Sequence, residues 1–462
     1  MQIFVNDTAS LAGSVTSLPA YTRRENPPPR PLTKHITQLL VNPNDKNSRP
    51  WITLTLFSGA RETKALPVYI EGEKITGSVD MNVEEGGSNI QTVKVIVRGE
   101  LLTGSETDDG MIFLDTSQTL WSKDTGKRLS GHQQWSFSVS LPKTVSIGNG
   151  EGTQFPLPPT VVERFTRASV RYDLIIHVVR RMFRYDSSLS STFVYIPATR
   201  PSPPSNLRQL SYQELNPLFG PESDPDGWTT LPPVEIHGTL FNTRQTEVIC
   251  HLSLAKPLCY ARGSVIPLSL LLLSRDSQAL DLFSNREAID VRLRRHINSR
   301  HDVMRTEVTH LMKMLPKVNN KPSEDSAVAV WWLSPEGCRE IEGDDGWITR
   351  RMNGEINLPK SLKPTCEIAH FSINYAVALF PFDTTGFQPS SHNNVNTNNL
   401  EPLLERRVGI ATMFPKGPRP VSYAPPHATG CRRHANRNSS LRPASSHTRG
   451  PDFMSLSYAY DF

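Results

Sequence analysis

The sequence lacks the long apolar runs and the cysteine patterns that define several classes of protein. Its longest apolar run, Val265 to Leu273, covers nine residues, about half of what a membrane-spanning helix needs. The five cysteines are odd in number and scattered, and none forms a CxxC pair. This pattern favours reduced thiols in a cytoplasmic protein over a disulfide framework or a zinc knuckle. The N-terminal stretch carries Asp7 and has no basic residue before Arg23, which is unlike a signal peptide.

Common catalytic motifs are absent as well. The sequence contains no GxGxxG, GxxxxGK[ST], HExxH or GxSxG pattern. His237 and His251 lie on predicted strands without a ligand partner at metal spacing, which favours packed or solvated histidines. We therefore expect a protein that is not an enzyme and that uses no metal and no cofactor.

Acidic residues are missing from one long stretch, between Glu405 and Asp452, which holds nine Lys and Arg residues. The net charge of +5 for the whole chain therefore leaves −4 for the remainder. The basic character belongs to the tail, so the sequence does not predict a nucleic-acid-binding body. A weak contact between this tail and anionic membranes is expected instead.

What the sequence does contain is the same all-β pattern twice, about 200 residues apart. The first copy comprises WSFSVSLP (135–142), LPPT (157–160) and SVRYDLIIHV (169–178); the second comprises MNGEINLP (352–359), LKPT (362–365) and FSINYAVAL (371–379). In each copy a strand ends on Leu-Pro, a Pro-Thr pair follows, and an alternating strand is centred on Tyr172 or Tyr375. Alternation with period two is typical of half-buried antiparallel strands. The repeat predicts an all-β protein with two tandem sandwiches.

The composition between these patterns divides the chain into five predicted segments. They are a disordered proline-rich leader (1–50), a first sandwich (51–196), a proline-rich surface linker (197–233), a second sandwich (234–383) and a disordered basic tail (384–462).

The order of these pieces resembles the arrestin-like family over about 51–383. The residues that carry the resemblance include Ile75-Thr-Gly-Ser-Val79, Val93 to Leu101, Leu157-Pro-Pro-Thr160 and Cys259 to Pro267. The chain is most similar to fungal arrestin-related trafficking adaptors. The resemblance implies two immunoglobulin-like β-sandwiches, and an adaptor that links the cytosolic regions of membrane transporters or receptors to a ubiquitin ligase.

A short motif in the leader supports that reading. Leu18, Pro19, Ala20 and Tyr21 form an LPxY sequence, a variant of the PPxY signal read by WW domains of Nedd4-type ligases. Proline presets an extended ligand that fits between aromatic side chains of the reader. A second match, Leu66 to Tyr69, leads directly into a predicted strand, so Tyr69 is expected to be a sheet residue.

Two other features are open to more than one interpretation. Ser440 and Ser445 lie in R-x-x-S sequences, which suit a basophilic kinase; a plain unmodified tail is the alternative. Arg292, Arg294, Arg295, Arg300 and Arg305 form a basic run, which is either a solvated face or a contact for acidic cargo tails or anionic lipid.

The sequence thus predicts a non-catalytic trafficking adaptor in ubiquitin-dependent endocytosis. Its location would be cytoplasmic, peripherally at the plasma membrane or endosomes. The alternative is a structural coat or scaffold subunit, similar to those of retromer, with the same double-sandwich fold. A hydrolase on a β-scaffold would need a nucleophile motif that the sequence lacks.

Overall fold

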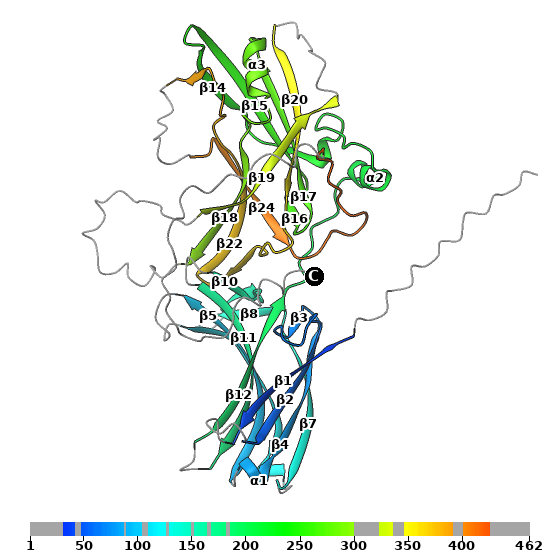
Figure 1. Ribbon diagram of the computed structural model, residues 1–462, viewed down its shortest axis with the longest axis vertical. Coiled ribbons are helices and arrows are strands. Elements are labelled where there is room, and N and C mark those ends of the chain that lie inside the picture. The colour runs from blue at the N-terminus through cyan, green and yellow to red at the C-terminus, as the bar shows by residue number, and fades with distance from the viewer. Residues whose placement is uncertain are drawn as a thin grey trace, which may run out of the picture. The chain divides into compact units, whose positions relative to one another are not determined.

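The computed structural model of the protein describes residues 31–41, 48–86, 89–103, 110–125, 129–148, 152–163, 168–181, 185–299, 323–335, 346–390 and 401–425 (Figure 1). The chain divides into two units, Met1–Pro31 and Leu32–Phe462. The described part of the second unit is mostly β-strand, as the sequence predicts.

The first half of this unit contains two sheets. A four-stranded antiparallel sheet has the order β1-β2-β4-β7, with β1 Thr33–Leu40, β2 Pro50–Ser58, β4 Lys74–Asn82 and β7 His132–Ser140. A six-stranded sheet has the order β3-β12-β11-β5-β6, with β10 beside β11. Its strands are β3 Val68–Ile70, β5 Ile90–Thr103, β6 Met111–Ser122, β10 Val161–Glu163, β11 Ala168–Arg180 and β12 Ser187–Ile196. Smaller elements are α1 Val83–Gly86, η1 Lys123–Thr125 and the pair β8 Thr144–Ile147 and β9 Thr153–Pro156.

The second half forms one twelve-stranded sheet whose main path is β16-β24-β22-β18-β19-β20-β17-β15-β14-β23. Its first strands are β13 Trp228–Thr230, β14 Val234–Leu240, β15 Arg244–Ala255, β16 Cys259–Ala261, β17 Val265–Ser274 and β18 Val291–Ser299. The others are β19 Ser323–Leu333, β20 Ile348–Asn357, β21 Cys366–Ile368, β22 Phe371–Leu379, β23 Phe387–Pro389 and β24 Leu404–Ala411. The helices are α2 Asn206–Glu214, η2 Pro225–Gly227 and α3 Ser277–Phe283.

The two halves repeat the same strand order. The path β1-β2-β4-β7 corresponds to β14-β15-β17-β20, and β3-β12-β11-β5-β6 corresponds to β16-β24-β22-β18-β19. The parallel pair β3–β12 has its counterpart in the parallel pair β16–β24. Each of these short strands is followed by a glycine with positive φ, Gly72 (90°) or Gly263 (74°), a conformation that glycine adopts without strain. We refer to the two halves as the first and second repeat.

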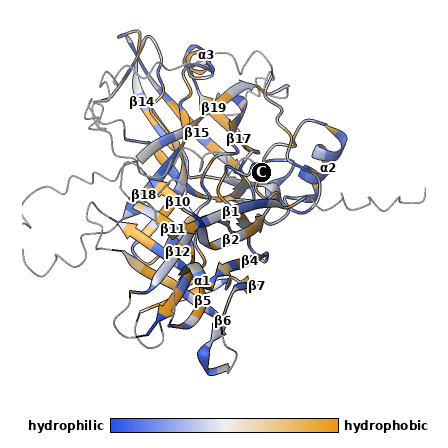
Figure 2. Ribbon diagram, turned by 60° about the horizontal axis from the view of Figure 1, so that its bottom comes forward, coloured by the Kyte–Doolittle hydropathy of each residue, from blue (hydrophilic) through white to orange (hydrophobic). Residues whose placement is uncertain are grey.

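Hydrophobic side chains on alternate strand positions form the core. In β5, Val93, Val95 and Val97 are fully buried, as period-two alternation requires. One large hydrophobic cluster contains buried residues of both repeats, and Ala60, Val68, Val194 and Ile196 form a second, smaller cluster. Figure 2 shows the hydrophobic residues along the strands, clearly so in β5 and β11. This architecture is all-β and β-sandwich-like.

The repeated Pro-Thr and tyrosine patterns make the same hydrogen bonds in both repeats. Tyr172 Oη donates to the carbonyl of Pro158 over 2.6 Å, and Tyr375 Oη donates to the carbonyl of Lys363 over 2.7 Å. Those carbonyls occupy the second position of LPPT and of LKPT. Both tyrosines are buried on β11 and β22. The sequence repeat therefore corresponds to a repeated structural unit.

The threonines of these motifs are equivalent in the same way. Thr160 Oγ1 accepts a hydrogen bond from the backbone N–H of Tyr195 on β12, and Thr365 Oγ1 accepts one from that of Ile410 on β24. Both distances are 2.9 Å. Strand β24 therefore completes the second repeat as β12 completes the first.

Replacing each repeat tyrosine by phenylalanine should test this equivalence. Tyr172→Phe and Tyr375→Phe each leave a backbone carbonyl without its donor, so each should lower the free energy of unfolding by about 1–2 kcal/mol. Tyr69→Phe is the matched control, because among the described residues the buried Tyr69 hydroxyl has no hydrogen-bond partner. Urea unfolding of the three variants should show two similar losses and an unchanged or raised stability for Tyr69→Phe. A loss for Tyr69→Phe as large as the other two would contradict the assignment.

Three predicted segment boundaries are wrong. The predicted leader contains β1, which pairs with β2 along its whole length. The predicted linker contains α2 and β13, and its Arg208 and Trp228 are buried. The predicted tail contains β23 and β24, and the described structure continues to residue 425. In each case an added strand pairs with a strand of a predicted sandwich (β1 with β2, β13 with β15 and β24 with β22), and such pairing is not evident from sequence composition.

Candidate functional site

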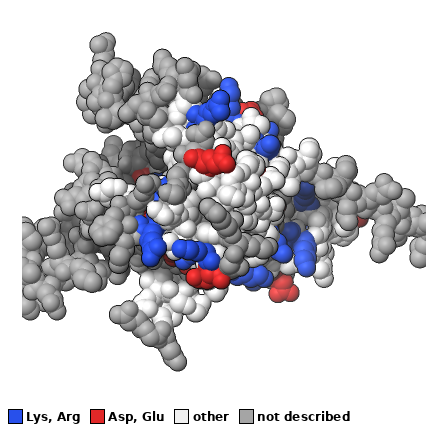
Figure 3. All heavy atoms as spheres, turned by 90° about the horizontal axis from the view of Figure 1, so that it is seen from below, with Lys and Arg blue, Asp and Glu red and all other residues white. Residues whose placement is uncertain are grey.

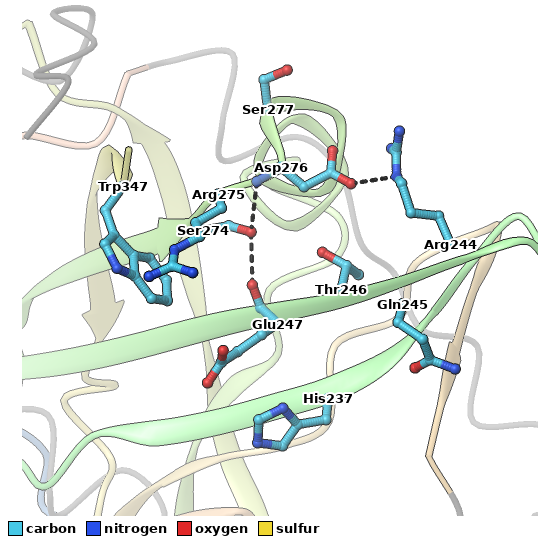
Figure 4. A pocket seen from close by; sticks show the side chains of 10 residues that line it. All are labelled: His237, Arg244, Gln245, Thr246, Glu247, Ser274, Arg275, Asp276, Ser277 and Trp347. Carbon is cyan, nitrogen blue, oxygen red and sulfur yellow. Dashed lines mark hydrogen bonds and ion pairs between the residues drawn. The ribbon is translucent and has the colours of Figure 1, made fainter. Parts of the chain in front are cut away.

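A polar pocket of about 640 Å³ lies in the second repeat, where β14, β15 and the end of β17 meet the start of α3 (Figure 4). It is lined by His237, Arg244, Gln245, Thr246, Glu247, Ser274, Arg275, Asp276, Ser277 and Trp347. Strand alternation divides these residues between two sides of β15. Figure 4 shows Thr246 on the side of α3, and Glu247 and His237 on the other side.

The side toward α3 is held by hydrogen bonds around the helix N-terminus. Asp276 caps α3 by accepting from the backbone N–H groups of Gln278 and Ala279, and its other oxygen lies 2.7 Å from Arg244 Nε. The Ser274 hydroxyl donates to the carbonyl of Glu247 over 2.7 Å. The Asp276 carboxylate has a structural role, because a capping carboxylate accepts hydrogen bonds from N–H groups of the first helical turn that have no partner within the helix. These groups form one wall of the pocket.

On the opposite side of β15, two lining residues, His237 and Glu247, lie close to Glu235, and the three groups can ligate a cation. One donor atom from each of Glu235, His237 and Glu247 lies within 4.8 Å of the others. His237 and Glu247 are direct partners in the β14–β15 register, and Glu235 precedes His237 by two residues on the same face. Carboxylate oxygens and imidazole nitrogen together suit divalent transition metals.

His237 was expected to be a packed or solvated histidine, and its side chain is 55% exposed; its proximity to two carboxylates was not expected. The partner Glu247 comes from the neighbouring strand, which local spacing along the chain does not include. The sequence feature that could have indicated this proximity is the hairpin formed by β14 and β15. Two alternating segments flank a turn in which Phe241 and Asn242 have positive φ, and this turn fixes which residues lie opposite each other.

The third feature of the pocket is a cation over an aromatic ring. The Arg275 guanidinium lies 5.0 Å from the centre of the Trp347 ring, within the range of a cation–π contact. Apart from the paired Asp276 and Arg244, the lining residues Arg275, Glu247 and His237 offer one cation, one carboxylate and one imidazole to a small polar ligand. The Ser274 hydroxyl beside these groups is committed to the backbone carbonyl of Glu247.

The basic run predicted as a solvated or cargo-binding face is instead internally paired where it is described. Arg292 contacts Asp290 and Asp325, and Arg294 lies 3.7 Å from Asp325. Arg295 reaches Glu163 of the first repeat. The remaining two arginines of the run, Arg300 and Arg305, lie outside the described residues.

Glu163 is the centre of a buried charge cluster that joins the two repeats. Its side chain is 3% exposed, and its Oε1 lies 3.0 Å from Arg295 Nη1 and 2.6 Å from Lys363 Nζ. Lys363 belongs to the LKPT motif, and its carbonyl accepts from Tyr375. Burial raises the pKa of the nearby Cys366 thiol to about 12, so that thiol is protonated at neutral pH.

The predicted short motifs fall in different places. Leu18, Pro19, Ala20 and Tyr21 lie outside the described residues, as do Ser440 and Ser445. Tyr69, from the second LPxY match, is a buried residue of β3 paired with Tyr195 of β12. Its position confirms the prediction of a sheet residue.

Charged side chains are distributed in separate groups on the described surface. On the face drawn in Figure 3, Lys and Arg side chains are interspersed with Asp and Glu around an uncharged area. Four of the nine basic residues assigned to the tail are among the described residues: Arg406 and Arg407 in β24, and Lys416 and Arg419 beyond it. The other five lie outside the described residues, and the membrane contact expected of the tail stays a prediction. Among the described residues, no helix is long and apolar enough to span a membrane.

Comparison with models of known families and with curated proteins found no match for this chain.

Proposed function

We propose that this protein is a non-catalytic trafficking adaptor of arrestin-like architecture, with two immunoglobulin-like sandwiches. The observation that carries the proposal is the repeated strand order, together with the equivalent tyrosine and threonine hydrogen bonds in the two repeats. Two such units in tandem present broad surfaces of strands and end loops, which suit recognition of extended protein segments. Fold alone does not define function, so the ligase contact needs its own test.

In the proposed function, the repeats bind the cytosolic region of a membrane transporter or receptor. The leader recruits a Nedd4-type ubiquitin ligase through Leu18 to Tyr21, and the ligase then marks the cargo for endocytosis. The burial of Tyr69 supports assigning the contact to the leader, because a WW domain binds an extended and accessible ligand. The protein would work in the cytoplasm, at the plasma membrane or endosomes.

Substituting the leader tyrosine tests the ligase contact. Tyr21→Ala in the full chain should weaken binding of a Nedd4-type WW domain at least tenfold, which corresponds to about 1.4 kcal/mol. The reason is that an aromatic side chain fills the groove beside the proline-binding surface. Titration calorimetry with the isolated WW domain measures the affinity directly.

Tyr69→Phe provides the matched control for that experiment, since it alters the other LPxY match and retains the buried ring. It should bind the WW domain as the unaltered chain does. Unchanged binding by Tyr21→Ala would refute the ligase contact and would favour the structural coat subunit, which needs no such motif.

A further inference from the structure

The segment that follows β24, which we term the strap (residues 412–425), crosses the second repeat beside α2 (Figure 1). It is anchored first near its start. Backbone N–H groups of Thr412 and Met413 donate to the side chain and the carbonyl of Thr199, each over 3.0 Å. Arg200 Nη1 donates to the carbonyl of Phe414 over 2.5 Å. The strap therefore lies along the connector between the repeats.

The second anchor is a buried carboxylate on β20. Glu355 is 1% exposed, and its two oxygens accept hydrogen bonds from Ser422 Oγ at 2.7 Å and from the Tyr423 backbone N–H at 2.6 Å. The Ala424 backbone N–H also contributes. Burial raises the pKa of Glu355, whereas these three strap hydrogen bonds oppose that shift. The docked strap thus replaces the water that a carboxylate otherwise requires.

Aromatic packing holds the same end of the strap. The ring of Tyr423 stacks on that of Tyr212 in α2, with 6.4 Å between centroids and 16° between planes. Tyr423 Oη donates to the carbonyl of Ser211 over 3.0 Å. Residue 422 is therefore adjacent to the packed ring of Tyr423. A charge placed at position 422 would affect the docking of this end of the strap.

Ser422 combines three properties that distinguish it from its neighbours. Its side chain is exposed, and its hydroxyl donates to a buried carboxylate. It also follows Arg419 by three residues, in the sequence Arg-Pro-Val-Ser. This is the R-x-x-S spacing noted for Ser440 and Ser445. We propose that Ser422 is a phosphorylation site for a basophilic protein kinase, and that its phosphorylation releases the strap from Glu355.

The phosphoryl donor is ATP, and the kinase supplies the catalytic groups. The Ser422 oxygen forms a bond to the γ-phosphorus, the bond from that phosphorus to the β,γ-bridging oxygen breaks, ADP leaves, and the hydroxyl proton passes to the kinase's base. Because Tyr423 is packed against α2 in the docked state, the kinase acts on the transiently released strap. Phosphorylation then prevents the strap from docking again, which is a shift in population.

Phosphorylation would release the strap because it places negative charge close to the Glu355 carboxylate. A phosphoserine carries about −1.5 to −2 charges at neutral pH, and the Ser422 oxygen lies 2.7 Å from Glu355 Oε2. The hydroxyl donor is lost at the same time, so an attraction is replaced by a repulsion. Like charges this close in a partly buried site repel by more than the energy of a tenfold change in population.

The test uses the full chain carrying Ser440→Ala and Ser445→Ala, which leaves Ser422 and, in the folded repeats, Ser187 and Ser211 at R-x-x-S spacing. The protein is treated with ATP and a kinase of R-x-x-S specificity, and mass spectrometry locates the phosphate. Hydrogen exchange of residues 412–425 should become about tenfold faster or more after phosphorylation. Trypsin cleavage after Lys416 should accelerate in parallel, whereas exchange in β5 and β11 should not change.

Two variants control the interpretation. Ser422→Ala should make exchange in the strap insensitive to the kinase. Glu355→Gln should reduce the acceleration, because the phosphate then faces a neutral amide. Failure of the kinase to modify Ser422 would overturn the proposal. Phosphorylation of Ser422 that leaves the hydrogen exchange of the strap unchanged would also overturn the proposal. An acceleration of exchange in Glu355→Gln equal to that in the parent chain would do the same.

Discussion

A chain that ends at Asp383, the boundary predicted from sequence, is expected not to fold its second repeat, whereas a chain that ends at Pro425 should fold it. The difference between the two is β23, β24 and the strap. Strand β24 occupies an interior position in its sheet, between β16 and β22. Its removal therefore exposes the edges of two strands at once.

The contacts of β24 indicate a large effect. It pairs with β22 from Leu379–Leu404 to Tyr375–Val408, and its Val408 and Ile410 are 5% and 2% exposed. Burial of each such side chain contributes about 1.5–3 kcal/mol, and each lost backbone hydrogen bond removes about 0.5–1.5 kcal/mol. The sum reaches about 5 kcal/mol or more, which is comparable with the total stability of a typical domain.

Circular dichroism and tryptophan fluorescence of the two chains would measure this effect. Trp331 is 2% exposed in the second repeat, so its emission should shift to the wavelength of a solvated indole in the shorter chain. The first repeat supplies an internal control, because β1 to β12 are unchanged and should remain folded. Equal spectra and equal melting temperatures for both chains would show that β24 is dispensable.

The reason that β24 escapes prediction is visible in its residues. Glu405, Arg406 and Arg407 stand together in it, and they interrupt any alternation of apolar and polar residues. Its partners in β16 and β22 are far away in the sequence, and such pairing depends on tertiary context rather than on local propensity. The hydrogen bond between Thr365 and Ile410 depends on the same long-range contact.

Strand β1 escaped prediction for a different reason. Its buried position is taken by His35, which is hydrogen-bonded to Ser58 Oγ at 2.9 Å, while Ile36 is 55% exposed. The polarity of the two faces is thus the reverse of what an alternating apolar pattern predicts. By contrast, the strands with regular alternation, such as Val93 to Val97 in β5, were predicted correctly.

The same distinction applies to the candidate pocket. Each of its residues is unremarkable within its own strand, and the cluster of Glu235, His237 and Glu247 arises only when β14 and β15 pair. The tyrosines of the repeat were found from sequence because each lies in a long alternating strand. A cluster that depends on which residues face each other across two paired strands could not be predicted from the pattern of a single strand.

The second large effect is expected at Glu163. Glu163→Gln should lower the free energy of unfolding by about 3 kcal/mol, because it leaves two buried cations without their shared carboxylate. The side chains of Arg295 and Lys363 are only 12% and 22% exposed. Water therefore compensates them poorly when the carboxylate is replaced by a neutral amide.

A surface ion pair of the first repeat is the matched control. Asp115 lies 2.8 Å from Arg98, with side chains 44% and 38% exposed, so Asp115→Asn should cost less than about 1 kcal/mol. Urea unfolding followed by fluorescence would compare the two variants. Adding Arg295→Met to Glu163→Gln should recover part of the loss, since one uncompensated cation is then replaced by an apolar side chain of similar length. Equal small losses for Glu163→Gln and Asp115→Asn would contradict a buried charge cluster between the repeats.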